Sequence, residues 1–397
     1  VITEGSLVEG LTARLEADAS VEAMRVGTFV VVEGQRKRFF SLVDNVTLGA
    51  TNEQILQNPP SADDGFLAQV LSGTSIYGTI SVAPMLMLEK DLRAEDAGLR
   101  PVKTVPSHFS PVYLADENDF ITVFGQDTVS GVLKVGKKKS FEMGKPLDMD
   151  VPVCLDLERF VERSNGIFGK SGTGKSFLAR LLLAGIIKSQ AAVNLVFDMH
   201  SEYGWQAITE SNGVFAKGLR QLFGGKVLIF TVDPESSRKR GITPDREVTI
   251  GLNQVDIEDI SLLQEELNLP ATAVESAYLV ASRFRDNWIR SLLDMGGEEM
   301  QVFCEEMGGH AGALSALQRR LRRLEGLGFM QDRVDEGAVD EMIACIEKGQ
   351  HIVLEFGQYR DPLAYMLVAN VLTRRLHKLY VDKTERYLQT GKAEDKP

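Results

Sequence analysis

The stretch GIFGKSGTGKSF, residues 166–177, constrains the fold of this chain more than any other segment. Residues 169–176 fit the pattern G-x-x-x-x-G-K-[S/T], in which a glycine-rich loop wraps the phosphates of a nucleotide. Glycine at 169, 172 and 174 permits backbone torsions that a Cβ would forbid. The loop amides can then converge on phosphate oxygens. Such a loop joins a strand to a helix and therefore predicts an α/β domain.

The flanks of the motif supply both elements. The short apolar run SNGIFG, residues 164–169, predicts a strand that enters the loop. Residues 175–188 predict a helix. Its apolar face consists of Leu178, Leu181, Leu182 and Ile186. This order of strand, loop and helix is the context in which the motif indicates triphosphate binding.

Each residue of the motif has an expected role. We expect nucleotide binding by Gly169, Lys170, Ser171, Gly172, Thr173, Gly174, Lys175, Ser176 and Phe177. Lys175 would reach the β- and γ-phosphates, and the Ser176 hydroxyl would hold Mg²⁺. The N-K-x-D pattern of GTP-specific proteins is not found. The expected cofactors are therefore ATP and Mg²⁺.

Hydrolysis also needs acids that manage the Mg²⁺ shell and orient the attacking water. Asp198 ends the apolar run LVF, at the edge where ligands bind in open α/β sheets. Glu202 follows four residues later, with His200 between them. We expect Lys175, Asp198, His200 and Glu202 to form the catalytic set. The alternative is that Asp198 caps the next segment and Glu202 is a solvated loop acid.

The rest of the C-terminal half predicts a parallel sheet with an inserted helical subdomain. Three apolar runs, 191–200, 225–233 and 351–357, predict buried strands. From about 256 to 346 the pattern is mostly helical. Within it, a seam of Leu314, Leu317, Leu321 and Leu324 is interleaved with Arg319, Arg320, Arg322 and Arg323.

Residues 1 to about 150 show a different pattern, with short β-branched or aromatic runs between Gly, Pro and Asn turns. The predicted strands are 24–34, 37–49, 75–88, 119–125 and 130–140. This spacing indicates a small barrel or sandwich followed by a linker. We therefore expect two domains, 1–150 and 151–397.

The segment FDMHSEYGW, residues 197–205, together with GKSGTGKS, resembles the D-x-H-G-E-Y element of HerA-type ATPases of the HerA–FtsK group. Ser201 replaces the usual glycine. The runs VGTFVVVEG and LVDNVTLG resemble the HAS-barrel that precedes the ATPase core in HerA. The resemblance implies a RecA-like P-loop NTPase core with a helical insertion, preceded by a small N-terminal β-barrel.

In function, the resemblance implies an ATP-dependent translocase or helicase that moves on double-stranded DNA as a homo-hexamer. It further implies a NurA-like nuclease or a defence effector as partner. Asp198, His200 and Glu202 would lie beside the γ-phosphate. One alternative is a ring-forming scaffold that binds ATP without helicase activity. A small-molecule kinase would explain the loop but neither the barrel nor the insertion.

The family's Walker B strand, an apolar run ending in paired acids, follows the strand matching 351–357 and one further helix. The sequence supplies that helix at 362–388 and then ends in QTGKAEDKP, and its first residue is Val1. The family's arginine fingers and sensor glutamine lie later still. We therefore expect a fragment of a longer protein that binds ATP better than it hydrolyses it. The alternative is a true terminus and a degenerate ATPase.

Charge and composition limit the partners and the location. With a net charge of −12, DNA contacts would have to come from local basic patches. The patches are KVGKKKS at 134–140, SSRKRG at 236–241 in an expected loop, and RRLRR at 319–323. A solvated helix face is the alternative for RRLRR. Three separated cysteines and no apolar run of the ~20 residues that a membrane span needs predict a cytoplasmic protein without a membrane partner.

Overall fold

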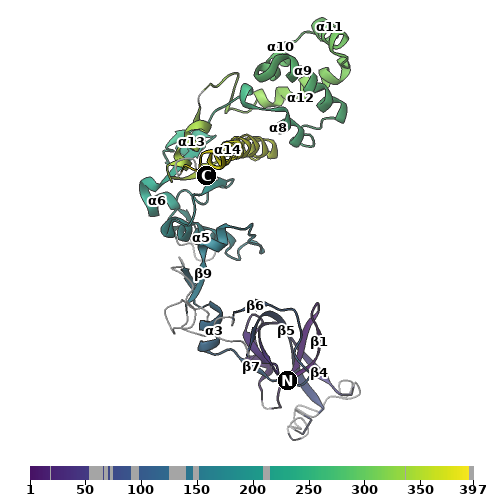
Figure 1. Ribbon diagram of the computed structural model, residues 1–397, viewed down its shortest axis with the longest axis vertical. Helices are drawn as coiled ribbons and strands as arrows, with labels where there is room; N and C mark the ends of the chain where they lie inside the picture. Colours follow the sequence, from purple (N-terminus) through teal and green to yellow (C-terminus); the bar gives the residue numbers. More distant parts are fainter. Residues whose placement is uncertain are drawn as a thin grey trace. The chain divides into compact units, whose positions relative to one another are not determined.

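The computed structural model describes residues 1–17, 19–52, 66, 70–71, 75–90, 98–124, 140–145, 152–208, 215–335 and 337–392. The chain separates into two compact units, Val1–Phe160 and Val161–Pro397, whose elements are labelled in Figure 1. Each unit has its own clusters of buried apolar side chains.

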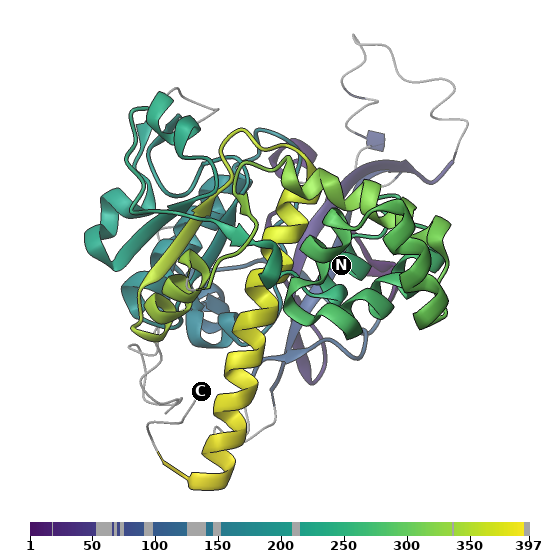
Figure 2. The same ribbon diagram turned by 90° about the horizontal axis from the view of Figure 1, so that it is seen from above.

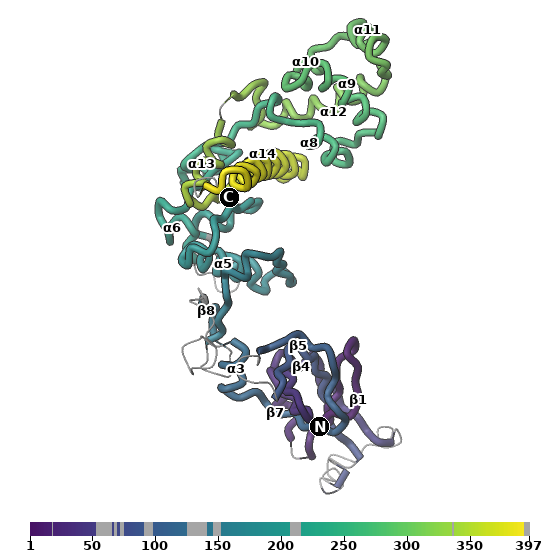
Figure 3. The backbone as a smooth tube through the Cα atoms, in the orientation of Figure 1, coloured from purple at the N-terminus to yellow at the C-terminus, as the bar shows by residue number. Residues whose placement is uncertain are grey.

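The first unit is built on an antiparallel sheet of seven strands among the residues described. Their order is β1 (Ile2–Ser6), β2 (Gly10–Arg14), β5 (Ile76–Glu89), β4 (Lys37–Ala50), β3 (Phe29–Glu33) and β7 (Val112–Leu114), with β6 (Arg100–Pro101) on β5. The Ile2 amide donates to the Ser110 carbonyl at 3.0 Å, and the Phe109 amide donates to the Ile2 carbonyl at 2.8 Å. These two bonds join the ends of the sheet. The strands therefore curve around a closed core, as the purple and blue tube in Figure 3 shows. The predicted barrel is confirmed.

The segment 119–125 was predicted as a strand, but residues 119–124 lie in a helix, α3 (Glu117–Phe124), and residue 125 is outside the described residues. The reason is local capping combined with tertiary packing. The Asp119 amide donates to Asp116 Oδ1 at 2.8 Å, which caps the first turn. The Phe120 ring then packs edge to face on an aromatic ring of β3, with 5.2 Å between ring centroids. This packing overrides the β propensity of the isolated segment.

The predicted strand at 130–140 lies outside the described residues except for Ser140, which begins β8 (Ser140–Gly144). The basic patch KVGKKKS is outside them in the same way. Strand β8 pairs antiparallel with β9 (Val153–Asp156), and α4 (Leu157–Val161) follows.

The second unit contains a parallel sheet with the order β10 (Leu195–Asp198), β17 (His351–Glu355), β13 (Val227–Thr231) and β14 (Arg246–Glu247). The first three strands confirm the three strands predicted for this region; β17 and β13 are mostly buried, whereas β10 is half-buried except at Asp198. Register places Asp198 beside Glu355, and Glu355 beside Thr231, at the carboxyl edge. This edge therefore gathers two acids from neighbouring strands.

The strand predicted over 164–169 is not formed. The segment has no ladder partner among the described residues, and the side chain of Phe168 is 94% exposed. Its apolar content is therefore not buried in the sheet. The helix that follows, α5 (Lys175–Ser189), does match its prediction.

Helices cover both faces of the sheet. Successive side chains of a strand point to opposite faces, and apolar side chains on both faces are buried by the helices. On one face, Val227, Ile229 and Val353 pack with Ile187 of α5 and with α6 (Leu219–Phe223). On the other face, strand side chains pack with buried residues of α13 (Ala338–Glu347) and α14 (Pro362–Thr390). The sheet is thus the middle layer of an α/β domain, which confirms the predicted fold class.

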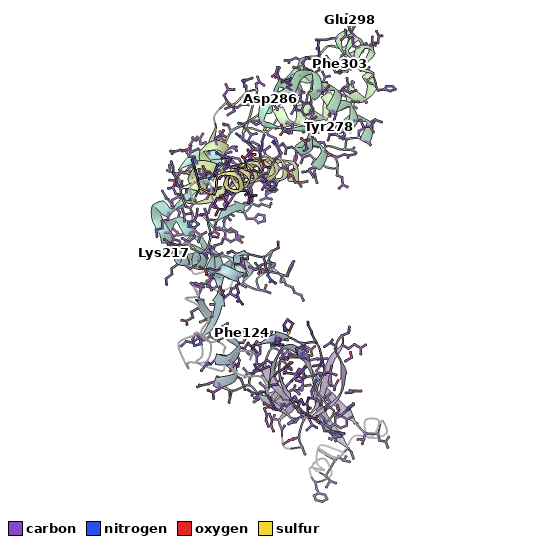
Figure 4. All side chains as sticks on the ribbon, viewed as in Figure 1. Phe124, Lys217, Tyr278, Asp286, Glu298 and Phe303 are labelled. Atoms are coloured by element: carbon purple, nitrogen blue, oxygen red, sulfur yellow. The ribbon has the colours of Figure 1, made fainter. Side chains whose placement is uncertain are left out.

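Between β15 (Ile250–Gly251) and β16 (Met330–Gln331) the chain is helical. The helices are α8 (Ile257–Leu262), α9 (Ala271–Phe284), α10 (Trp288–Asp294), α11 (Gly297–Met307) and α12 (Ala311–Glu325). Figure 2 shows them as a green bundle, and Figure 4 labels Tyr278 and Phe303 within it. The predicted leucine seam of α12 is buried, and the four arginines between its leucines are exposed.

The remaining short elements are α7 (Pro234–Lys239), β11 (Ala207–Ile208), β12 (Phe215–Ala216), and 3₁₀ turns at Val21–Ala23, Gly224–Lys226, Leu252–Gln254 and Arg285–Asn287. No helix in the described part of the chain is both long enough and apolar enough to cross a bilayer.

The leucine seam yields a stability prediction. Leu317 is fully buried in α12, so Leu317→Ala should lower the free energy of unfolding by about 2–5 kcal/mol through lost burial and a residual cavity. Leu262→Ala is the control, because Leu262 is 64% exposed and should change stability by less than about 0.5 kcal/mol. Urea unfolding followed by circular dichroism compares them. Equal effects would contradict the packing described.

Candidate nucleotide site

Residues 169–174 form an exposed loop, and the last two residues of the motif, Lys175 and Ser176, begin α5. Gly172 and Gly174 have positive φ angles of 77° and 87°. Thr173 donates twice to the Lys170 carbonyl, from its amide at 3.3 Å and from Oγ1 at 2.7 Å. A Cβ at Gly169 would lie 2.6 Å from Thr173 Oγ1. Torsion therefore favours glycine at positions 172 and 174, and a side chain at 169 would force the Thr173 hydroxyl to shift.

The charged groups of the loop suit a polyphosphate. Lys175 Nζ donates to the Lys170 carbonyl at 2.6 Å, which holds the ammonium over the loop. The helix begins at once, since the Leu178 amide donates to the Gly174 carbonyl at 2.9 Å. Amides of the first turn of α5 are thus left without intrahelical acceptors, at the positive end of the helix dipole. Ser176, half-buried in that turn, supplies the hydroxyl that could hold Mg²⁺. The residues present fit a magnesium-bound nucleoside triphosphate.

Asp198 caps the loop that follows β10. Its Oδ1 accepts the Glu202 amide at 2.9 Å, and its Oδ2 accepts the amides of Tyr203 at 2.8 Å and Gly204 at 3.4 Å. The residue is 1% exposed. Burial raises the pKa of Asp198, and the three amide bonds oppose that rise. This is the capping arrangement that the sequence left open as the alternative for Asp198.

The other two predicted acid–base residues are less enclosed. Glu202 is half-buried, and its carbonyl oxygen accepts a hydrogen bond from Arg180 of α5 at 2.5 Å. His200 is exposed and makes no side-chain hydrogen bond or ion pair within the described ranges. The structure therefore brings Glu202 to the α5 side of the sheet edge and leaves His200 in solvent.

Two residues beside the loop were not predicted from the sequence. Arg180 is 8% exposed, and its guanidinium ties α5 to the loop 198–205. Tyr203 is the second. Burial raises the pKa of Tyr203, the charges of Glu202 and Asp198 add to the rise, and the Ser176 hydroxyl and the Arg180 charge oppose it. Ser176 and Arg180 are four residues apart on a helix, and this spacing was the available signal.

An ion pair whose acid is buried lies at the same edge. Glu355 Oε2 accepts a hydrogen bond from Arg240 at 2.7 Å, and Glu355 is fully buried. Burial raises the pKa of Glu355, Arg240 opposes the rise, and Asp198 adds to it. A Cβ at Gly204 would lie 2.9 Å from Glu355 Oε1 and 2.9 Å from Ile229 Cδ1, so a side chain there would force these buried groups to shift. The sequence signal for Glu355 was its place at the end of an apolar strand, like that of Asp198.

Two of the predicted basic patches, SSRKRG and RRLRR, lie among the described residues, and both are on helices. SSRKRG was expected in a loop, but its first four residues lie in α7. The reason is an N-terminal cap, since Asp233 accepts the Ser236 amide at 3.0 Å, with proline in the first turn. Arg238 of this patch pairs with Glu247 at 2.7 Å. In RRLRR, Arg323 donates to the Glu266 carbonyl at 2.7 Å.

The parallel sheet, the phosphate loop and the helices on both faces define a P-loop ATPase domain. Comparison with known proteins narrows this class. Residues 141–376 match the family model described as the central domain of helicase HerA, and residues 1–104 match the HAS barrel domain. Because the first match spans more than half of the chain, the chain belongs to the HerA helicase family.

Among curated proteins, the probable helicase MJ1565 of Methanocaldococcus jannaschii is 29% identical over 188 residues. The matched segment covers 46% of this chain and 32% of that protein. The chain thus spans about a third of the length of this relative.

The buried acids predict a pH dependence of stability. The pKa of Glu355 in the folded state lies above its ordinary value of 4.5, so the folded state binds more protons than the unfolded state as pH rises past that value. Stability from this group is present at lower pH and is lost as pH rises through the raised pKa. Glu355→Gln should therefore remove part of the stability loss as pH rises above 4.5.

Urea unfolding across that range measures this effect. Glu247→Gln is the control, because Glu247 is a half-exposed acid that is also paired with an arginine. Parallel stability curves for Glu355→Gln and the wild type would show that burial does not raise the pKa of Glu355.

Proposed function

We propose that this chain is the nucleotide-binding part of an ATP-driven motor that forms a homo-hexameric ring and moves on double-stranded DNA. The observation that carries the proposal is the open phosphate loop, with Lys175 held over it and the amides of α5 behind it, in a member of the HerA helicase family. The description of the relative as a probable helicase supports nucleic acid as the substrate.

In this proposal each residue of the site has a role set by its position. The amides of 169–176 and the Lys175 ammonium bind the phosphates, and the Ser176 hydroxyl is the protein oxygen available to Mg²⁺. The bound ion would neutralise phosphate charge. Asp198 holds the next loop in place through three amides. Glu202, with a less buried carboxylate, is then the better placed acid for orienting a water.

DNA contacts in this proposal come from local cations. Arg319, Arg320 and Arg322 are exposed on α12 and form no ion pair with any described residue. A ring channel concentrates the field of such groups, so they attract phosphates even in a protein with a net charge of −12. The ring would act in the cytoplasm with a NurA-like nuclease or another effector.

A second candidate is a ring-forming scaffold that binds ATP without moving on DNA. The observation that favours it concerns Asp198, whose two oxygens are already occupied by backbone amides. In that case the site binds nucleotide and supports assembly, and turnover is slow.

The role of Lys175 yields a prediction. Lys175→Ala removes a charge-assisted hydrogen bond to phosphate, so ATP affinity should fall by about 10- to 150-fold and DNA-stimulated ATPase activity should be lost. Lys188→Ala, at the exposed end of the same helix, is the matched control and should bind like the wild type. Calorimetric titration measures the affinities. Unchanged affinity in Lys175→Ala would rule out the loop as the phosphate site.

The motor and the scaffold differ in their response to DNA. A motor should show ATPase activity that rises with duplex DNA and a hexameric mass in solution. A scaffold should form ATP-dependent rings whose rate of ATP hydrolysis does not change when DNA is added. Steady-state ATPase assays of the intact protein, paired with light scattering, separate the two. A monomer without DNA stimulation would contradict both.

A further inference from the structure

The backbone of Glu202 is held on both sides of its Cα atom. Its amide donates to Asp198 Oδ1 at 2.9 Å, at the end of β10. Its carbonyl oxygen accepts a hydrogen bond from the Arg180 guanidinium at 2.5 Å, from the second turn of α5. Because a residue has only two soft backbone torsions, fixing its amide and its carbonyl also fixes the direction of its Cα–Cβ bond. The Glu202 side chain therefore leaves the loop in a defined direction.

The neighbours of Glu202 hold the same segment. Ser201 has a positive φ angle of 55°, a left-handed conformation that residues with a side chain seldom adopt. The amides of Tyr203 and Gly204 donate to Asp198 Oδ2 at 2.8 Å and 3.4 Å. The carbonyl oxygens of these two residues accept the first two amides of α6 at 2.9 Å and 3.0 Å. A strained turn is thus maintained by hydrogen bonds to the residues that follow it.

The carboxylate of Glu202, in contrast, is not held. It forms no hydrogen bond or ion pair with any described residue, and Glu202 is half-buried. A free carboxylate on a fixed backbone can accept a proton from a water molecule without first breaking an ion pair. This combination is suited to a general base.

Arg180 holds this acid against the helix that carries the phosphate motif. Ser176 and Arg180 are four residues apart, so they share one face of α5 and lie about 6 Å apart along its axis. Arg180 is 8% exposed, and its Nε has no hydrogen-bond partner among the described residues. Burying a cation against one neutral acceptor is unfavourable for stability. A role in function is therefore the better explanation for its position.

We infer that Arg180 is a positioning residue for ATP hydrolysis that acts through Glu202. Its guanidinium holds the Glu202 carbonyl against α5 and thereby aims the carboxylate at the attacking water. In that step the water oxygen bonds to the γ-phosphorus, the bond from this phosphorus to the ADP oxygen breaks, and the water proton passes to Glu202. The inference rests on the proposed nucleotide function and deepens it.

The test separates hydrolysis from nucleotide binding in the intact protein. ADP affinity, measured by calorimetry, should agree within about 2-fold between the wild type and Arg180→Met, because Lys175 and the loop amides are unchanged. This agreement also shows that the variant is folded. The rate constant for single-turnover ATP hydrolysis should fall by about 10- to 100-fold in Arg180→Met, the effect of a misplaced catalytic group.

Three further variants sharpen the result. In a Glu202→Gln background, Arg180→Met should have no additional effect on the rate, because the carboxylate that it positions is gone. Arg180→Lys keeps a cation and a donor, so it should recover about 3- to 10-fold of the lost rate. Lys188→Met, at the exposed end of the same helix, is the matched control and should hydrolyse ATP like the wild type.

A second readout follows the backbone of the loop. The amides of residues 202–204 should exchange with deuterium faster in Arg180→Met, because the loop has lost one of its anchors. Their exchange should be unchanged in Glu202→Gln, which alters only a side chain that forms no bond with the described residues. Unchanged exchange in Arg180→Met would show that the guanidinium does not hold the loop and would overturn the inference.

The kinetic outcomes are also distinct. Equal rates of hydrolysis in the wild type and Arg180→Met would overturn the inference and leave the proposed function intact. A fall in ADP affinity as large as the fall in rate would also overturn it, since Arg180 would then contact the nucleotide or support the fold. A wild type that binds ADP but does not hydrolyse ATP would overturn the inference and favour the scaffold. Failure of the wild type to bind nucleotide would remove both the inference and the proposed function.

Discussion

Three backbone amides on one buried carboxylate hold together the edge of the sheet on which the nucleotide site depends. Without Asp198, the amides of 202–204 would lose their shared acceptor. Burying the carboxylate is unfavourable by itself, and it lies beside a second buried acid, Glu355, because parallel register aligns the two strand ends. The amides and the Arg240 guanidinium offset that cost. The positions of both buried carboxylates are therefore fixed by their hydrogen-bond partners.

Hydrogen bonds also connect this edge of the sheet to α5 and α6. Arg180 contacts the loop from the helix that carries the phosphate motif, and the carbonyl oxygens of Tyr203 and Gly204 accept the first amides of α6. The helices themselves are held by apolar packing on the sheet. The glycine-rich loop, the carboxyl edge of the sheet and the segment 198–205 are thus connected through α5 and α6. The N-terminal barrel closes around a core of its own, so its fold does not depend on these connections.

Much of this was predictable, and the failures have physical causes. The motif and the hydrophobic periodicity of α5, β13, β17 and α14 are local signals, and they predicted these elements correctly. The strand predicted at 119–125 failed because capping at Asp116 and packing on β3 come from outside the segment. The role of Asp198 needed the backbone path of 202–204, and the pairing of Glu355 with Arg240 joins residues 115 positions apart. Patterns of residue spacing predict only local contacts, so they could not predict this pair.

The central claim is that residues 169–176 bind the phosphates of a magnesium-bound nucleotide and that this loop acts with the segment 198–205. Hydrogen–deuterium exchange with and without Mg²⁺ and ADP tests it most directly, because it reads the amides themselves. The account predicts slowed exchange in the loop and the first turn of α5, slowed exchange in the segment 198–205, and unchanged exchange in the barrel. Protection confined to another region, or none in the loop, would contradict it.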